Sequence, residues 1–139
     1  MSLRYLLDTN ALSEPARPVK NLAFMRRLAQ VTQEIATCAP AEAEVWYGLE
    51  ILPRGRRRDA LEAYYTGILA AIPILPLDAA AARVHGRLRA ELRRVGRTAP
   101  YADSLIAAVA LSRGLTLVTA NVRDFAGIPD LQVEDWTAV

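Results

Sequence analysis

The sequence has one cysteine, Cys38, and one histidine, His85. A single cysteine cannot form a disulfide within the chain, and it excludes a zinc site built from several thiolates. A single histidine excludes zinc sites that need two or more imidazoles. We expect Cys38 to be a small buried apolar residue and His85 to be structural. The shortage of cysteine fits a protein of the reducing cytoplasm.

Long apolar runs are also missing. No run reaches the length needed to span a bilayer, and the apolar stretch at residues 67–77 contains two prolines, which fits a buried core better. The apolar residues that open the chain stop at Asp8 and are too few for a signal peptide. We therefore expect a cytoplasmic protein with no membrane partner.

Lysine is nearly absent: of 17 basic residues only Lys20 is a lysine, and the rest are arginine. The planar guanidinium of arginine favours bidentate contact with phosphate, so nucleic acid is a reasonable partner even at a net charge of +2. An ordinary solvated surface is the open alternative. The arginines gather in two places, which are the cluster Arg54, Arg56, Arg57 and Arg58 and the helical stretch with Arg83, Arg87, Arg89, Arg93, Arg94 and Arg97.

The length of 139 residues and the hydrophobic fraction of 53% fit one globular domain over residues 1–139. Apolar patterns predict strands that alternate with helices, which indicates an α/β fold of three layers, α/β/α, with a mostly parallel sheet. The predicted strands are 3–7, 34–37, 74–75, 115–118 and 131–133. The predicted helices are 21–30, 40–52, 57–69, 78–96 and 100–114, with a brief helical turn at 11–15.

Polar residues follow the predicted strands where a parallel sheet binds its ligands, at the carboxyl ends. Asp8, Thr9 and Asn10 come directly after the first strand. The fourth strand is followed by Thr119, Asn121 and Asp124.

Two further carboxylates lie on neighbouring helices. Glu44 is on the helix after the second strand, and Asp103 is in the first turn of the helix that leads to the fourth strand. Together with Asp8 they would form a cluster of hard oxygen ligands, which suits Mg²⁺ or Mn²⁺. Such ions offset the repulsion between carboxylates, lower the pKa of a bound water and stabilise charge on a phosphate.

Each acidic residue also has a simpler explanation. Asp8 can cap a helix, and Asp103 can be a favourable charge at a helix N-terminus. Glu44 alone would be a solvated surface residue, and Asn121 a turn residue. Glu42 lies two positions from Glu44 on another face of the same helix, so we expect it to be solvated. The joint placement at one end of one sheet favours the metal site.

Four segments resemble the motifs of PIN domains of the VapC type. They are residues 8–12 (DTNAL), 44–48 (EVWYG), 102–108 (ADSLIAA) and 118–125 (VTANVRDF), and the ending at 131–136 also fits. Each motif is weak alone, but their order and spacing match the family over essentially the whole chain.

The resemblance implies a PIN-like fold and a divalent-metal-dependent endoribonuclease that cleaves RNA with Mg²⁺ or Mn²⁺. It implies the toxin of a type II toxin–antitoxin pair, a homodimer inhibited by a cognate antitoxin. It carries metal binding onto Asp8, Glu44 and Asp103. Some PIN domains have aspartate where this chain has Asn121, so Asp124 is a candidate for the fourth catalytic carboxylate.

Other residues are expected to assist this function. Asn10, Thr119 and Asn121 are predicted to support the site, and Arg54, Arg56, Arg57 and Arg58 to bind RNA phosphates. Trp46, Tyr47 and Tyr101 flank the motifs, so they are candidates for stacking on bases, although we expect at least one of them to pack in the core. The stripe Leu22, Met25 and Leu28 is expected in the core, with any exposed part free to receive an antitoxin helix.

Three other functions compete with this one. A phosphoryl-transfer enzyme of the haloacid-dehalogenase type needs a second aspartate where this chain has Asn10. A response-regulator receiver needs a late lysine, and the only lysine is Lys20. A PIN scaffold without catalytic activity, which only binds partners, is kept open by Asn121.

Overall fold

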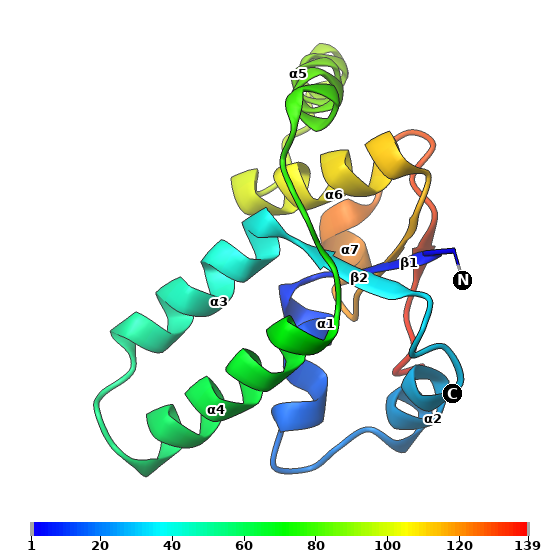
Figure 1. The fold of residues 1–139 in the computed structure, drawn as a ribbon. Coiled ribbons are helices and arrows are strands. Elements are labelled where there is room, and N and C mark those ends of the chain that lie inside the picture. The colour runs from blue at the N-terminus through cyan, green and yellow to red at the C-terminus, as the bar shows by residue number, and fades with distance from the viewer. Residues whose placement is uncertain (1, 139) are drawn as a thin grey trace.

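The computed structural model describes residues 2–138, and its centre is a sheet of five parallel strands (Figure 1). Their order across the sheet is β3-β2-β1-β4-β5. Every residue of the middle strand β1 is buried, because helices cover both faces of the sheet. The strands are β1 (Tyr5–Leu7), β2 (Ile35–Cys38), β3 (Ile74–Leu75), β4 (Thr116–Val118) and β5 (Val133–Glu134).

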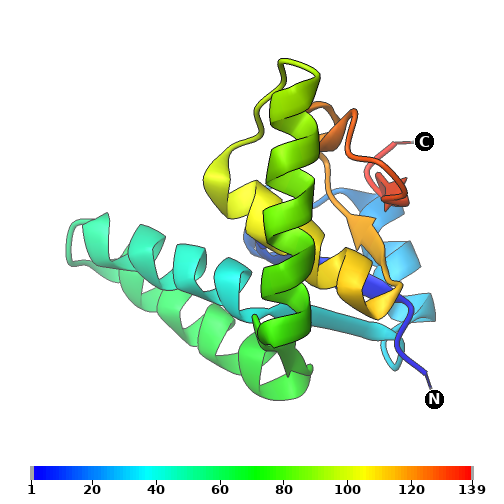
Figure 2. The ribbon, with the colours of Figure 1, turned by 90° about the horizontal axis from the view of Figure 1, so that it is seen from above.

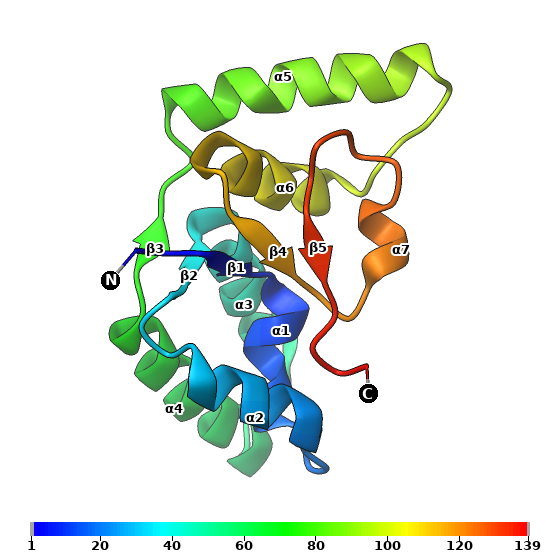
Figure 3. The same cartoon turned by 90° about the vertical axis from the view of Figure 1, so that its right-hand side faces the viewer.

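The connections between the strands are helical, as the alternating pattern predicts. The elements α1, α2 and α4 lie on one side of the sheet, and α6 and α5 are stacked on the other (Figure 3). The helices are α1 (Thr9–Ser13), the 3₁₀ helix η1 (Glu14–Ala16), α2 (Leu22–Gln30), α3 (Ala39–Ile51), α4 (Arg56–Ala71), α5 (Ala79–Arg94), α6 (Tyr101–Arg113) and α7 (Val122–Phe125).

Helix α6 is the central helix of its layer. Its residues from Ile106 to Ala110 are all buried, since the sheet covers one side of the helix and α5 covers the other. A helix that is apolar all round is stable only when it is enclosed in this way. Gly114, at φ 65°, then ends α6 in the left-handed conformation that glycine adopts without strain.

Helix α5 is amphipathic and packs on the outside of α6. Asp78 caps its N-terminus by accepting a 2.9 Å hydrogen bond from the Ala81 backbone N–H. Leu88 and Leu92 are among the buried residues of its inner face, whereas its arginines are exposed, which are Arg83, Arg87, Arg89, Arg93 and Arg94. The opposite face of α5 is therefore a long basic surface.

Helices α3 and α4 form a hairpin that projects from the sheet (Figures 1 and 2). At its tip the Arg58 guanidinium donates to the Leu52 carbonyl at 3.2 Å and pairs with Glu50 at 3.3 Å. The Arg58 side chain thus satisfies a carbonyl at the end of α3 and closes the turn. The hairpin holds α3 against α6 at one end and exposes Arg54, Arg56 and Arg57 at the other.

The predicted elements are confirmed, with differences of a few residues at their ends. The first helix begins at Thr9, ahead of the predicted turn at 11–15, because Asp8 caps it. Helix α7 was not predicted, since four residues are too few to show a helical period. In α2 the buried residue is Phe24, whereas Leu22, expected in the core, is exposed. Cys38 is completely buried, as expected.

Within residues 2–138, none of the helices combines the length and the apolar character that crossing a membrane requires.

Candidate active site

The candidate site lies where β1 and β4 end, between the two halves of the sheet. The chain runs outward from β1 in one direction through β2 and β3, and in the other through β4 and β5. The carboxyl ends of strands at such a switch point form a crevice between the flanking loops. Asp8 follows β1 and Thr119 follows β4, so both lie at this point.

Asp8 is buried, with 4% of its surface exposed, and it is fixed by hydrogen bonds. Its Oδ1 atom accepts a 2.7 Å bond from the Ala11 backbone N–H, which caps α1. Burial raises the pKa of Asp8 above its ordinary value and the Glu44 carboxylate adds to this, while the bonds from Thr119 and Ala11 oppose it. Asp8 is therefore a helix cap and also a carboxylate held in the crevice.

Glu44 enters the crevice from α3 and is held by the residue that follows Asp8. The Thr9 hydroxyl donates a 2.6 Å hydrogen bond to Oε1 of Glu44. This bond joins the first turn of α1 to α3, so it fixes the glutamate relative to β1.

A second set of hydrogen bonds fixes Thr9 itself. The Ser13 hydroxyl donates to the Thr9 carbonyl at 2.9 Å, so its only proton is used there. The 2.6 Å contact between Ser13 Oγ and the Tyr65 hydroxyl must then have Tyr65 as its donor. Tyr64 also donates to the Leu12 carbonyl at 2.6 Å. Helix α4 thereby holds α1 and, through Thr9, Glu44. Sequence reasoning missed Ser13, Tyr64 and Tyr65, because their contacts span 52 residues.

Asp103 has the most strongly perturbed carboxyl group of the site. Burial, together with the carboxylates of Asp124, Glu44 and Asp8, raises its pKa to about 6. Negative charges raise a pKa in this way when they are near, so the charges of Asp124, Glu44 and Asp8 all act on the Asp103 carboxyl group. A strongly perturbed carboxyl in a crevice is typical of a functional site.

The segment after β4 contributes polar groups. The Thr119 hydroxyl accepts a 2.9 Å hydrogen bond from the Asn121 backbone N–H, which shapes the turn into α7. Asp124 lies in α7 and is exposed, and its charge acts on Asp103. Asn121 is exposed at the start of the same helix, and Asn10 is half-buried on α1 beside Thr119. The three polar residues predicted to support the site thus all lie at this edge of the sheet.

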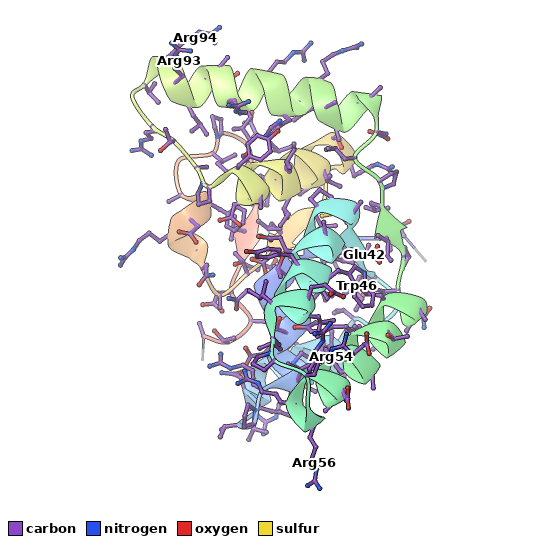
Figure 4. The ribbon with its side chains drawn as sticks, turned by 90° about the vertical axis from the view of Figure 1, so that its left-hand side faces the viewer. Glu42, Trp46, Arg54, Arg56, Arg93 and Arg94 are labelled. Carbon is purple, nitrogen blue, oxygen red and sulfur yellow. The ribbon has the colours of Figure 1, made fainter. Side chains whose placement is uncertain are left out.

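Glu42 was predicted to be solvated, and this is wrong. Its side chain is half-buried and accepts a 2.9 Å hydrogen bond from the Trp46 indole N–H (Figure 4). The two residues are one helical turn apart on α3, so their side chains are neighbours. Trp46 packs against the core, as expected for at least one aromatic near the motifs, whereas Tyr47 and Tyr101 are exposed.

The donor chemistry of the site fits a hard divalent cation. Its candidate ligands are carboxylate oxygens, with hydroxyl and amide oxygens beside them. Within residues 2–138, no three acidic, histidine or cysteine side chains converge closely enough to enclose an ion. Mg²⁺ requires no such enclosure, because proteins usually hold it through one or two carboxylates while it keeps several waters and binds substrate phosphates. The residues therefore fit an Mg²⁺-type ion.

Comparison with known proteins places the chain in a family. The model of the PIN domain matches residues 5–131. The tRNA(fMet)-specific endonuclease VapC of Shigella flexneri is 35% identical over 137 residues, which cover 97% of this chain and 99% of that protein.

Solved structures agree with this assignment. DNA-bound VapBC from Salmonella typhimurium contains a chain with 32% identity and a TM-score of 0.84, with coverage of 96% of this chain and 98% of that one. A member of the VapBC family of toxin–antitoxin systems from Mycobacterium tuberculosis, VapBC-5, has 28% identity and a TM-score of 0.71, with 96% of both chains covered. The chain therefore belongs to the PIN-domain family, and within that family to the VapC group.

Proposed function

We propose that this chain is a divalent-metal-dependent endoribonuclease and the toxin of a toxin–antitoxin pair. The observation that carries the proposal is the set of carboxylates at Asp8, Glu44, Asp103 and Asp124, where burial, together with the charges of the other three, raises the pKa of Asp103 to about 6. Carboxylates that repel one another destabilise the folded state at neutral pH. A set of them in one crevice therefore suggests a functional purpose. The names of its relatives, which include endonucleases and ribonucleases, support RNA cleavage as that purpose.

In this mechanism Asp8, Glu44 and Asp103 would hold one or two Mg²⁺ or Mn²⁺ ions. A bound ion would lower the pKa of a water and offset charge on the scissile phosphate. Asp8 is kept in place by the Ala11 N–H and Glu44 by the Thr9 hydroxyl. Asp124, Thr119, Asn121 and Asn10 would complete the polar edge that faces the phosphate. We assign no covalent nucleophile.

The only histidine does not serve as a base in this proposal. His85 is buried between α5 and α6, and its Nε2 atom lies 2.8 Å from the Ser104 hydroxyl. Ser104 uses its proton on the Tyr101 carbonyl at 2.6 Å, so the N–H of His85 must be the donor. His85 is thus engaged in packing the two helices, which supports an account in which carboxylates and metal carry the chemistry.

We further propose a homodimer that binds RNA and a cognate antitoxin. Two exposed apolar pairs support contacts with other chains: Tyr47 and Ile51 on α3, and Val19 and Leu22 at the start of α2. The solved VapBC relatives support an antitoxin as one of these chains. A toxin of this kind would act in the cytoplasm, where its RNA substrates are made.

The test is cleavage of RNA by the purified chain with Mg²⁺ or Mn²⁺, with EDTA as the control. We expect cleavage with a metal ion that stops on chelation and returns when Mn²⁺ is restored. Cleavage that persists after exhaustive chelation would contradict the metal mechanism. Binding of RNA or antitoxin without any cleavage would identify the chain as an inactive PIN scaffold.

A further inference from the structure

A cavity of about 760 Å³ lies between the C-terminal half of α5 and the first turn of α6, apart from the carboxylate cluster. This volume falls within the range of about 300–1,000 Å³ that is typical of ligand sites. In the part of the chain that the structure describes, no acidic residue lines the cavity. Its polar lining consists of Arg89, Arg93, Arg97, Thr98, Tyr101 and Ser104.

Tyr101 is the exposed aromatic wall of this cavity, and it is held in place. The residue is 61% exposed, and the Arg89 guanidinium lies over its ring at 5.3 Å from the centroid. The buried His85 ring meets the tyrosine edge to face at 5.4 Å, and Ser104 donates to the Tyr101 carbonyl. Tyr101 and Arg89 therefore form an ordered stack that is open to solvent.

Arg97 is also directed by its surroundings. Its guanidinium lies against Gly127, in the space that a side chain at that position would occupy. Gly127 has φ 83° and belongs to the turn after α7. Arg97 therefore places a positive group at the edge of the cavity.

We propose that this cavity binds one nucleotide of the RNA strand next to the cleaved bond, with its base against Tyr101 and Arg89 and its phosphate against Arg93 and Arg97. The proposal rests on the nuclease function proposed above. Unpaired bases stack on aromatic rings and on guanidinium planes, and arginine forks match phosphate oxygens. An aromatic–guanidinium stack beside further arginines, with no acid in the lining, fits a nucleotide better than an acidic peptide.

The position of the cavity assigns it to a flanking nucleotide. Tyr101 and Asp103 are two positions apart in the first turn of α6, so their side chains point to different sides of the helix. The scissile phosphate would lie on the Asp103 side, with the carboxylates. A strand that passes the end of α6 would then place its neighbouring nucleotide on the Tyr101 side.

The experiment measures binding of a short single-stranded RNA of mixed sequence by fluorescence anisotropy in EDTA, over a range of salt concentrations. The variants are Tyr101→Ala and Arg93→Ala. The matched control is Arg94→Ala, because Arg94 is the next residue of α5 and lines a different pocket (Figure 4). An abasic oligonucleotide of the same length is the second probe. Melting curves check that each variant folds.

We expect Tyr101→Ala to weaken RNA binding by about 5- to 100-fold, as for the loss of one stacked base, and to bind the abasic probe like the wild type. Arg93→Ala should lower the slope of log affinity against log salt by about 0.7 for both probes. Arg94→Ala should leave both quantities unchanged.

Two results would overturn the subsite. One is RNA binding by Tyr101→Ala and Arg93→Ala that matches the wild type, and the other is an equal loss in Arg94→Ala, which would indicate a general basic surface. A wild-type protein that binds RNA but never cleaves it would instead refute the nuclease function and leave the binding comparison valid. The two failures are therefore distinguishable.

Discussion

The Thr9 hydroxyl donates a 2.6 Å hydrogen bond to Oε1 of Glu44, and this bond ties the start of α1 to α3 across 35 positions of the chain. Thr9 follows Asp8, so one short segment positions two of the carboxylates proposed to hold metal. Groups that orient metal ligands typically affect metal affinity or activity by about 10- to 100-fold. Thr9 is thus a positioning residue, and it can be tested separately from the carboxylates.

We predict that Thr9→Val weakens Mn²⁺ binding and RNA cleavage by about 10-fold or more, because it removes the hydroxyl and keeps the branched shape. Thr9→Ser keeps the hydroxyl and should restore most of both. Calorimetric titration of Mn²⁺ and a cleavage assay would measure the effects. If the valine and serine variants bind Mn²⁺ equally well, the hydrogen bond does not position Glu44 for metal.

A second prediction concerns Asp103→Asn, which should abolish cleavage and leave the fold intact. The folded pKa of Asp103 is about 6, raised from 3.8, so the ionised group destabilises the folded state above that pH. The penalty shrinks as the pH falls through 6 and is gone below 3.8. Asparagine removes the charge, so the metal-free variant should melt at or above the wild-type temperature near neutral pH.

Metal ions should reverse this comparison. Mn²⁺ stabilises whichever folded protein binds it more tightly, so the wild type should gain more in melting temperature than Asp103→Asn. Melting curves with and without Mn²⁺, at neutral and at acid pH, would measure both effects. If Asp103→Asn cleaves RNA at the wild-type rate and is stabilised equally by Mn²⁺, Asp103 is only a favourable charge at the N-terminus of α6 and does not bind metal.

We predict that the arginines of the hairpin tip have two different roles, one in stability and one in RNA binding. Arg58 closes the turn through Leu52 and Glu50, so Arg58→Ala should lower the melting temperature. Arg56 (Figure 4) and Arg57 are exposed, and alanine at either should leave the melting temperature unchanged. If they contact phosphate, each change lowers the salt slope of RNA binding by about 0.7. An unchanged slope in the double variant would assign the tip to solvated surface.

We also predict that the chain alone is a homodimer in solution. Tyr47 and Ile51 are exposed one turn apart on α3 and form an apolar pair that a second chain can cover. Light scattering at micromolar concentration should give about twice the mass of one chain. A monomeric mass would count against the dimer, and replacement of Ile51 by a charged residue should shift a true dimer towards monomer.

The sequence predicted the fold well because its signals are local. Short apolar runs, the Asp78 cap and Gly114 mark the strand and helix ends almost to the residue. The sequence also placed Asp8 and Thr119 at one edge of the sheet, since residues directly after neighbouring parallel strands must meet there. The apolar pattern and the cap residues were therefore enough to predict the fold. The parallel strand order was enough to predict where the candidate site would lie.

Contacts between distant residues could not be predicted in the same way. The hydrogen bond between Tyr65 and Ser13 depends on how α4 is laid against α1, which no local pattern records. Helical spacing correctly separated the faces of Glu42 and Glu44. It did not reveal that the Trp46 indole would hold Glu42 in a half-buried position. The hydrogen-bond partners of these side chains could be identified only from the structure.

The measurement that tests the central claim most directly is RNA cleavage with Mn²⁺ by Glu44→Gln, with Glu42→Gln as its matched control. Both changes remove one carboxylate from α3, two positions apart. Only Glu44 belongs to the cluster that acts on Asp103, whereas Glu42 bonds Trp46 through an oxygen that glutamine also supplies. We predict that Glu44→Gln loses cleavage and that Glu42→Gln keeps it. Equal activity in the two variants would contradict a carboxylate-held metal site at this edge of the sheet.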